Sequence, residues 1–224
     1  MDTDHFGLTA GDYVPDPERD TALIVDSFFA AVAASAREHG IDDDPTPELR
    51  NRLVDLEAAN ADRIVDEPAR HNLRMALALV VAYHFLAPRI GREPAALVVR
   101  RAFVEPTGFA VQEGTRAMLD TAADPFTAMV QVSKAREKYT FGAGFEFERP
   151  VDDDNRYHVD VVHCFYHEVL AAHSAAELTP AMCAFDGNWI AAIAPDEHGF
   201  RFDRATTIGF GGSRCPFHFD RISR

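Results

Sequence analysis

The hydrophobic pattern of the chain changes its period near Gly142, and this change constrains the fold more than any other feature. Between Asp20 and Lys138 apolar residues recur at the spacing of helices. After Gly142 they alternate with polar residues, as Phe145 and Phe147 do, which is typical of a strand that buries one face. Helices followed by a strand-rich section predict an α+β fold, in which an N-terminal helical layer packs on a C-terminal antiparallel sheet with inserted helices.

Prolines, glycines and capping residues mark the ends of the predicted helices. Asp124 and Pro125 form a predicted N-cap and first helical residue, and Gly40 is a predicted stop. Pro106 is predicted to interrupt the helix that Pro94 opens. The predicted helices cover residues 21–38, 47–66, a helix from 68 whose centre at 73–86 is apolar nearly all round, residues 94–103, and 126–138.

Strand patterns and turn clusters divide the second half. Residues 144–149 and 157–163 flank a turn cluster at 150–155 and predict a hairpin. Predicted helices follow at 165–173 and 179–194, and a second hairpin joins strands 200–208 and 215–219 through a glycine turn at 209–212. The chain thus divides into an acidic N-terminal tail (1–19), a helical region (20–141) and an α+β region (142–224). We expect the helical region and the α+β region to form one compact domain.

Charge and motif content exclude several classes of function. Lysine and arginine number 22 against 36 acidic residues, and a net charge of −14 argues against nucleic acid or an anionic membrane as partner. The sequence has no phosphate-binding or dinucleotide-binding glycine motif and no Gly-x-Ser-x-Gly of a serine hydrolase. A small-molecule substrate is therefore the expected partner, and a homo-oligomer is compatible with the sequence.

The sequence also indicates a compartment. The longest apolar run, residues 75–87, is too short to span a bilayer. The first 20 residues are acidic and contain glycines and prolines, unlike a secretory leader. We therefore expect a cytoplasmic protein.

The cysteines are the residues that most suggest chemistry. Cys164, Cys183 and Cys215 are odd in number and far apart, which argues against a disulfide framework and against the short cysteine spacings of structural zinc sites. No cofactor is expected. A metal site formed by the three cysteines with His167 stays open as an alternative.

Cys183 has the strongest case for reactivity. Thr179 and Pro180 predict a helix start just before it, and the partial positive charge of a helix N-terminus favours a thiolate. Asp186 follows one helical turn later, so its carboxyl group can exchange a proton with the thiol. A bare carboxylate raises the pKa of a thiol, so the pair works best with one shared proton.

The segment from Arg204 to Cys215 is a second candidate. Its structural interpretation is a strand, a flexible glycine turn and a return strand. In a functional interpretation, Gly211 and Gly212 allow backbone N–H groups to approach a ligand, and Arg204 or Arg214 holds a carboxylate by two parallel hydrogen bonds.

These positions resemble the L-2-amino-thiazoline-4-carboxylic acid hydrolase family over the last third of the chain. The family pattern has a strand ending in cysteine with an aromatic residue two positions on, a cysteine–aspartate pair, an arginine with a threonine and a glycine, and a closing Cys-x-Phe. The matching residues are Cys164 with Tyr166, Cys183 with Asp186, Arg204 with Thr207, Gly211, and Cys215 with Phe217.

The resemblance implies a hydrolase that opens a C–N bond of a cyclic amidine or thiazoline-like ring in amino-acid or specialised metabolism; the namesake reaction converts 2-amino-thiazoline-4-carboxylate to N-carbamoyl-cysteine. Cys183 would attack the C=N carbon and Asp186 would carry the proton. Arg204 would hold the substrate carboxylate or else form an ion pair within the sheet. Cys164 and Cys215 would flank the nucleophile, and Tyr166, Thr207 and Gly211 would line the site.

Other classes of function share parts of this pattern. Organomercurial lyases also use a Cys-x-x-Asp pair with a distant cysteine, which Cys183, Asp186 and Cys215 resemble more faintly. A third interpretation is a small-molecule, metal or haem sensor whose cysteines grip the ligand without catalysis. Bound metal or haem in the purified protein would favour that binding module.

Overall fold

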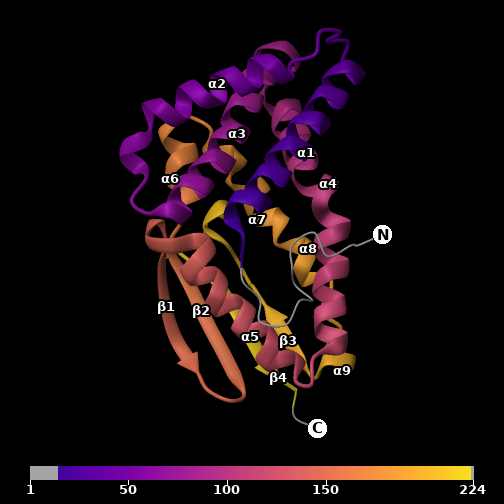
Figure 1. Cartoon of the computed structure of the whole chain (residues 1–224), viewed down its shortest axis with the longest axis vertical. Helices are drawn as coiled ribbons and strands as arrows, with labels where there is room; N and C mark the ends of the chain where they lie inside the picture. The colour runs from indigo at the N-terminus through magenta and orange to yellow at the C-terminus, as the bar shows by residue number, and fades with distance from the viewer. Residues whose placement is uncertain (1–14, 223–224) are drawn as a thin grey trace.

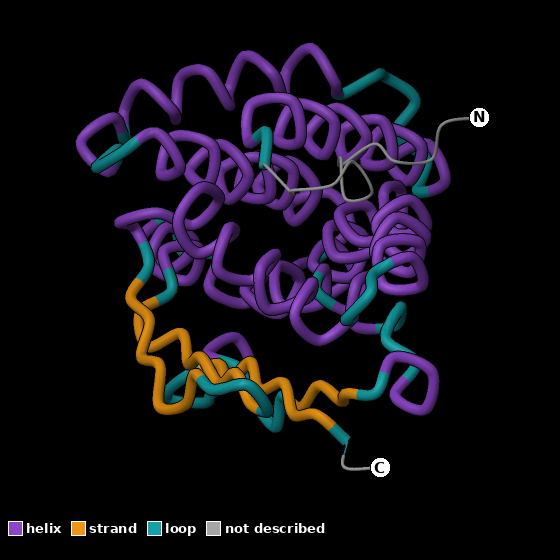
Figure 2. The backbone as a smooth tube through the Cα atoms, turned by 60° about the horizontal axis from the view of Figure 1, so that its bottom comes forward, coloured by secondary structure: helices purple, strands orange, loops and turns teal. Residues whose placement is uncertain are grey.

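A computed structural model describes residues 15–222 and shows a helical layer beside an antiparallel sheet (Figures 1 and 2). The predicted α+β fold is confirmed. The helical half contains α1 (Pro17–Glu38), α2 (Thr46–Ala59), η1 (Ala61–Arg63), α3 (Glu67–Ile90), α4 (Arg92–Thr121) and α5 (Pro125–Arg136). A π-helix, η2 (Glu137–Phe141), and a short 3-10 turn, η3 (Gly142–Gly144), lead into the sheet.

The second half alternates strands and short helices. Its elements are β1 (Glu146–Asp152), β2 (Arg156–His163), α6 (Phe165–Ala172), η4 (Ala176–Leu178), α7 (Thr179–Phe185), α8 (Gly187–Ile190), α9 (Pro195–His198), β3 (Phe200–Asp203), η5 (Ile208–Phe210) and β4 (Cys215–Arg221). The strand order is β1-β2-β4-β3, and every neighbouring pair is antiparallel.

Aspartate caps begin three of the long helices. The carboxylates of Asp16, Asp66 and Asp124 accept the backbone N–H three residues on, and a proline lies in the first turn of each helix. Asp124 therefore caps α5 as predicted. Helix α1 begins at Pro17, four residues before the start predicted at residue 21. Of the predicted acidic tail, residues 1–19, residues 1–14 lie outside the described chain.

The central helix α3 carries the core. Most of its side chains are buried against α1, α2, α4 and α6, as its apolar centre predicts. With 24 residues, α3 is longer than its apolar run and passes a length and composition test for membrane crossing, but 67% of its most apolar stretch is buried inside the protein. That burial is typical of a core helix.

Pro106 does not interrupt α4, contrary to the prediction. The helix continues for 30 residues from Arg92 to Thr121 with Pro106 inside it. A proline in a helix interior costs about 3 kcal/mol through a lost hydrogen bond and a steric clash. Packing compensates, because α4 contacts α1, α3, α7 and α8.

The strands differ from prediction at their ends. β1 runs on through Pro150 to Asp152, where a turn cluster is predicted, because β1 is an edge strand and an edge tolerates proline. The strand predicted at 200–208 stops at Asp203. From there the chain leaves the sheet, and the next residue, Arg204, bonds Asp186 at the edge of a cavity that both residues line.

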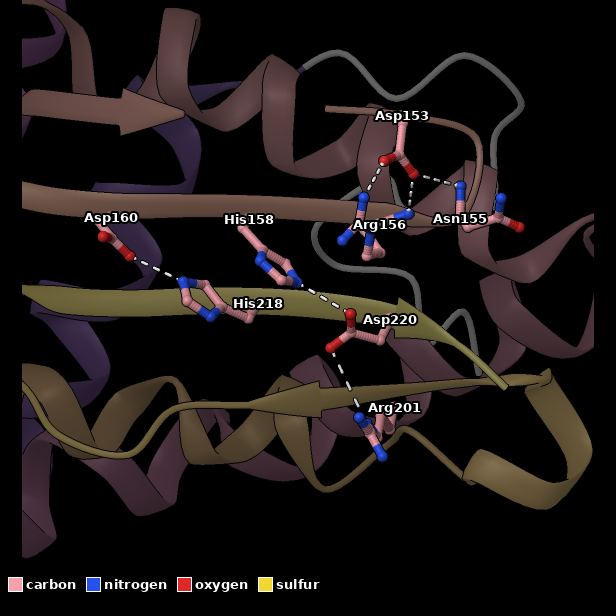
Figure 3. Close-up of polar contacts among 8 residues, drawn as sticks. All are labelled: Asp153, Asn155, Arg156, His158, Asp160, Arg201, His218 and Asp220. Carbon is pink, nitrogen blue, oxygen red and sulfur yellow. Dashed lines mark hydrogen bonds and ion pairs between the residues drawn. The ribbon is translucent and has the colours of Figure 1, made fainter. Parts of the chain in front are cut away.

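The two faces of the sheet have opposite characters. Tyr157, Val159 and Val161 on β2 pair with Phe219, Phe217 and Cys215 on β4, and this face turns toward the helices. The other face carries a row of paired charges (Figure 3). There the rings of His158 and His218 stack at 4.1 Å and bond Asp220 and Asp160 respectively. The apolar face of the sheet thus packs on the core and lines the cavity.

Candidate functional site

A cavity of about 180 Å³ lies between the helical layer and the inner face of the sheet. Cys164, Cys183 and Cys215 all line this cavity, together with Asp186. They come from the N-terminus of α6, from α7, from the start of β4 and from the junction of α7 with α8. All three cysteines are free thiols. Folding therefore gathers the thiols and the carboxyl group around one space.

Cys183 does not lie at a helix start, contrary to the prediction. Helix α7 has only 7 residues, and Thr179 is its first residue rather than its cap, so Cys183 falls in the last turn. The Thr179 hydroxyl instead bonds His167 Nδ1 at 2.9 Å. The partial charge of the helix N-terminus therefore does not act on the Cys183 sulfur.

The predicted helix 179–194 breaks at Asp186, which separates α7 from α8. Its carboxylate has a partner at each oxygen: Arg204 Nη1 lies 2.6 Å from Oδ2, and Trp189 Nε1 donates to Oδ1 at 3.2 Å. Arg204 Nη2 also donates to the backbone carbonyl of Cys183 at 3.1 Å. Arg204 thus forms the ion pair considered as its rival role, with Asp186 across the cavity rather than within the sheet.

Arg204 is further fixed by Phe217. Its guanidinium carbon lies 5.3 Å from the centre of the Phe217 ring, a cation–π distance. Phe217 and Cys215 face the cavity from the same side of β4, because residues two apart in a strand share a face. The closing Cys-x-Phe therefore supplies both a sulfur and the platform of the arginine.

Gly209 brings the backbone of the loop after β3 against the Cys183 thiol. A Cβ atom at Gly209 would lie 2.8 Å from Cys183 Sγ and 3.0 Å from the backbone of Thr179, closer than atoms normally approach. Sequence patterns did not single out this residue. It is visible in the sequence as one of the glycines of the loop, but only the fold shows which glycine meets the sulfur.

The electrostatics of the cavity favour a neutral thiol at Cys183. Burial is the largest cause and raises the pKa of Cys183, and the neighbouring Asp186 carboxylate raises it further. The Thr207 hydroxyl, the Gly209 N–H and Arg204 act in the opposite direction. Without a substrate, the site therefore holds a thiol beside a carboxylate.

The other two thiols are further from ionisation. Burial raises the pKa of Cys164 to about 12 and that of Cys215 to about 11. Cys215 Sγ also accepts the backbone N–H of Ile208 at 3.1 Å, which fastens the loop to β4. These features are those of structural, poorly nucleophilic sulfurs.

Two predicted site residues lie outside the cavity. Gly211 is exposed with φ +85°, and a Cβ atom there would meet nothing within 4 Å, so it serves a left-handed turn rather than a ligand. The N–H groups of Gly211 and Gly212 bond the carbonyls of Ile208 and Thr207 within that turn. Arg214 points to Glu148 and Asp160.

The alternative metal site receives no geometric support. Among the described residues, one group of potential ligands has its atoms within 4.8 Å of one another, and it consists of Asp120, Glu197 and His198. Cys164, Cys183, Cys215 and His167 do not form such a group. His198 Nδ1 accepts the N–H of Ala194, which leaves Nε2 to donate to Asp120, so that trio is explained as a hydrogen-bond network.

Aromatic side chains form a large part of the remaining wall, and most of them were predicted only as strand or helix residues. Tyr166, a predicted lining residue, lies among them, and its hydroxyl donates to Asn72 Oδ1 at 2.7 Å. The aromatic lining consists of Phe103, Phe141, Phe145, Phe147, Tyr166, Phe185, Trp189 and Phe217.

Together, the fold and the cavity define an α+β protein with a cavity lined by thiols and a paired carboxylate. The sequence profile of the L-2-amino-thiazoline-4-carboxylic acid hydrolase family matches residues 71–219, well over half of the 224 residues. The chain belongs to this family. The fainter resemblance to organomercurial lyases is not supported. No curated protein and no solved structure matches the chain.

Proposed function

We propose that this protein is a cysteine-dependent hydrolase that opens a cyclic amidine ring such as that of a 2-aminothiazoline, with Cys183 as nucleophile and Asp186 as proton carrier. The observation that carries the proposal is the convergence of Cys183 and Asp186 on one cavity in a member of a hydrolase family. Of the three thiols, Cys183 alone has a backbone N–H, a hydroxyl and a guanidinium that together oppose the effect of burial on its pKa.

A positively charged substrate would make the neutral Cys183 thiol reactive. Amidines are basic and enter the cavity as cations, and the Asp186 carboxylate attracts such a cation. A positive charge beside Cys183 lowers its pKa and offsets the desolvation that raises it in the empty site. The thiol is thus activated only when a substrate is bound.

In the first step, the sulfur of Cys183 bonds to the amidine carbon while Asp186 accepts the thiol proton. The electron pair of the C=N bond moves to nitrogen, and a tetrahedral adduct forms. The adduct then expels the ring heteroatom, which takes the proton back from Asp186. For a 2-aminothiazoline the bond that breaks is C–S rather than the expected C–N bond. For a 2-amino ring that contains only nitrogen, a cyclic guanidine, it is C–N. In both cases the ring opens with an isothiourea left on Cys183.

In the second step, water attacks the isothiourea carbon and gives a proton to Asp186. The new tetrahedral adduct expels the Cys183 sulfur, which regains that proton, and a urea leaves the site. The sum is one substrate and one water converted to one ring-opened product, with the enzyme regenerated. For 2-amino-thiazoline-4-carboxylate the product is N-carbamoyl-cysteine.

Arg204 is a positioning residue in this mechanism. Its guanidinium bonds both the Asp186 carboxylate and the carbonyl of Cys183, and so fixes the acid relative to the nucleophile. A substrate carboxylate can share the outer edge of this guanidinium, but the hydrogen bonds in the structure serve Asp186.

The test combines product analysis with capture of the intermediate. Purified protein is incubated with 2-amino-thiazoline-4-carboxylate, and mass spectrometry follows the gain of one water in the product and the isothiourea adduct on a Cys183 peptide. We expect Cys183→Ser to abolish turnover, and Cys164→Ser and Cys215→Ser to serve as matched controls that keep most of it. Full turnover by Cys183→Ser, or binding of the compound without turnover by the parent protein, would contradict the proposal and favour the binding module.

A further inference from the structure

The cavity extends from the thiols along an aromatic wall to the π-helix. Phe145 lies 5.0 Å from both Phe141 and Tyr166, measured between ring centres, and Phe147 lies 6.0 Å from Phe141. All of these rings line the cavity. Tyr166 connects this wall to the reactive end, since it lines the same cavity as Cys164 and Asp186 and its ring packs against Phe145.

At the π-helix, the Asn72 side chain is fully paired and the Thr140 hydroxyl is not. Asn72 accepts the Tyr166 hydroxyl and donates to the carbonyls of Thr140 and Phe141 at 2.9 and 3.2 Å. These bonds hold the wide turn of η2 against α3. The Thr140 hydroxyl is buried at the cavity and has no hydrogen-bond partner within the described part of the chain.

Two threonines with buried hydroxyls, Thr140 and Thr207, line this cavity. The Thr207 hydroxyl lies at the Cys183 end and acts on the thiol, whose pKa it lowers. Thr140 lies on the π-helix and has no such partner among the described residues. An unpaired buried hydroxyl is unfavourable. A ligand that reaches the π-helix offers the Thr140 hydroxyl a partner.

We infer that the substrate is a cyclic amidine that carries an aromatic or similarly bulky apolar group, with a hydrogen-bond acceptor at its far end facing Thr140. This inference rests on the proposed function, since it assigns the amidine to the Cys183 end. The apolar group packs against Phe141, Phe145 and Phe147, and the acceptor receives a hydrogen bond from the Thr140 hydroxyl. A compact zwitterion such as the namesake thiazoline carries no group that covers this aromatic wall.

Apolar area and hydrogen-bond pairing both favour the longer ligand. Burying an aromatic ring removes a large apolar surface from water on both the ligand and the wall, and aromatic pairs add to that gain. Rings whose centres lie 5.0 to 6.0 Å apart pack against one another and form a continuous apolar surface, which a small substrate at the reactive end leaves uncovered. The wall is therefore a determinant of specificity.

A binding experiment separates this inference from catalysis. Trp189, the single tryptophan of the chain, lines the cavity, so its fluorescence reports occupancy. The Cys183→Ala variant is titrated with 2-amino-thiazoline-4-carboxylate, with its 5-phenyl derivative and with its 5-pyridyl derivative. We expect the phenyl compound to bind at least about tenfold more tightly than the parent compound, and the pyridyl compound, which adds an acceptor, to bind more tightly still.

Thr140→Val tests the far-end contact, with Thr115→Val as the matched control. Thr115 also carries a buried hydroxyl without a partner among the described residues, but it lies on α4 and does not line the cavity. Both variants lose an unpaired hydroxyl, so both are expected to fold and to melt no lower than the parent. Only Thr140→Val should weaken binding of the pyridyl compound, by about fivefold to tenfold, with the phenyl compound unaffected.

The outcomes are distinguishable. Equal or tighter binding of the unsubstituted thiazoline would overturn the inference, even where that compound is hydrolysed by the parent protein. Tighter binding of the phenyl compound supports the inference, even where neither compound is hydrolysed and the proposed function fails. Unchanged pyridyl binding in Thr140→Val would remove Thr140 from the site.

Discussion

Gly209 and Cys183 meet so closely that a single methyl group between them would lie 2.8 Å from the sulfur. This approach sets the backbone N–H of Gly209 toward the thiol, where it lowers the pKa against the larger effect of burial. The loop after β3 is therefore part of the proposed nucleophile's environment, although it lies far from α7 in the sequence.

We expect Gly209→Ala to displace the Cys183 thiol and to reduce kcat by about tenfold to a hundredfold, because misplacement of a nucleophile by a fraction of an ångström has effects of this size. Steady-state kinetics with 2-amino-thiazoline-4-carboxylate measures the change. Gly187→Ala is the control, since a Cβ there meets nothing within 4 Å. Equal kcat values for the two variants would show that the close approach has no bearing on catalysis.

The buried thiols predict loss of stability at alkaline pH. Cys164 and Cys215 have pKa values raised by burial from 9.0 to about 12 and about 11, so the unfolded chain releases their protons first. A raised pKa stabilises the fold below the unfolded value and loses this contribution as pH rises toward the folded value. Denaturant unfolding between pH 8 and pH 11 should show falling stability, and the fall should be shallower in Cys164→Ala. If the stability of Cys164→Ala falls with pH as steeply as that of the parent protein, groups other than this thiol cause the loss.

The same electrostatics revise the expected reactivity of Cys183. A thiolate held at a helix start would react rapidly with iodoacetamide at neutral pH. Burial and Asp186 raise the pKa of Cys183 instead, so alkylation of the empty site should be slower than that of a free thiol and should accelerate above pH 9. Peptide mass spectrometry after timed alkylation measures the rate. Rapid labelling at pH 7 would place the sulfur in a different environment.

Local patterns predicted the parts of the fold that local physics decides. The Asp124 cap, the buried centre of α3 and the strand that begins at Cys215 follow from caps and periodicity, and each is confirmed. Pro106 was misjudged because packing of α4 on its neighbours outweighs the local preference for a break.

The finer geometry of the site depends on tertiary contacts that no spacing encodes. The Asp186 carboxylate is held by Trp189 of α8 and by Arg204, which comes from the segment after β3, 18 residues further along the chain. Gly209 and Gly211 look equivalent in the sequence, yet one meets the sulfur and the other forms an exposed turn. The π-helix that turns Thr140 to the cavity has no recognisable sequence signal.

Asp124 forms an ion pair between the helical layer and the sheet, and we expect its contribution to stability to be lost in acid. Its carboxylate caps α5 and bonds Arg221 of β4 at 2.5 and 3.0 Å, and the hydrogen bonds from Arg221 hold its pKa well below the usual range. A lowered pKa contributes stability above the unfolded value, near 3.8, that is lost as pH falls below it. Asp124→Asn retains a capping side chain but loses the ion pair. The variant should melt a few degrees lower at pH 7, and the difference should shrink as the pH is lowered from 5 to 2. A difference that is independent of pH would exclude the ion pair as its cause.

Arg204→Lys tests whether Arg204 positions Asp186. Lysine keeps the positive charge but cannot reach both the Asp186 carboxylate and the Cys183 carbonyl, which arginine bonds with different nitrogens. We expect kcat to fall by about tenfold or more while KM changes little. The pH at which kcat is half-maximal should also move, because the charge beside Asp186 is displaced.

Arg214→Lys is the matched control: Arg214 lies in the same segment but pairs with Glu148 and Asp160 at the sheet. A purely structural Arg204 would lower the melting temperature and leave the pH profile of kcat unchanged. A substrate-binding Arg204 would raise KM most. A fall in kcat with a shifted pH profile therefore identifies the positioning role and separates it from both alternatives.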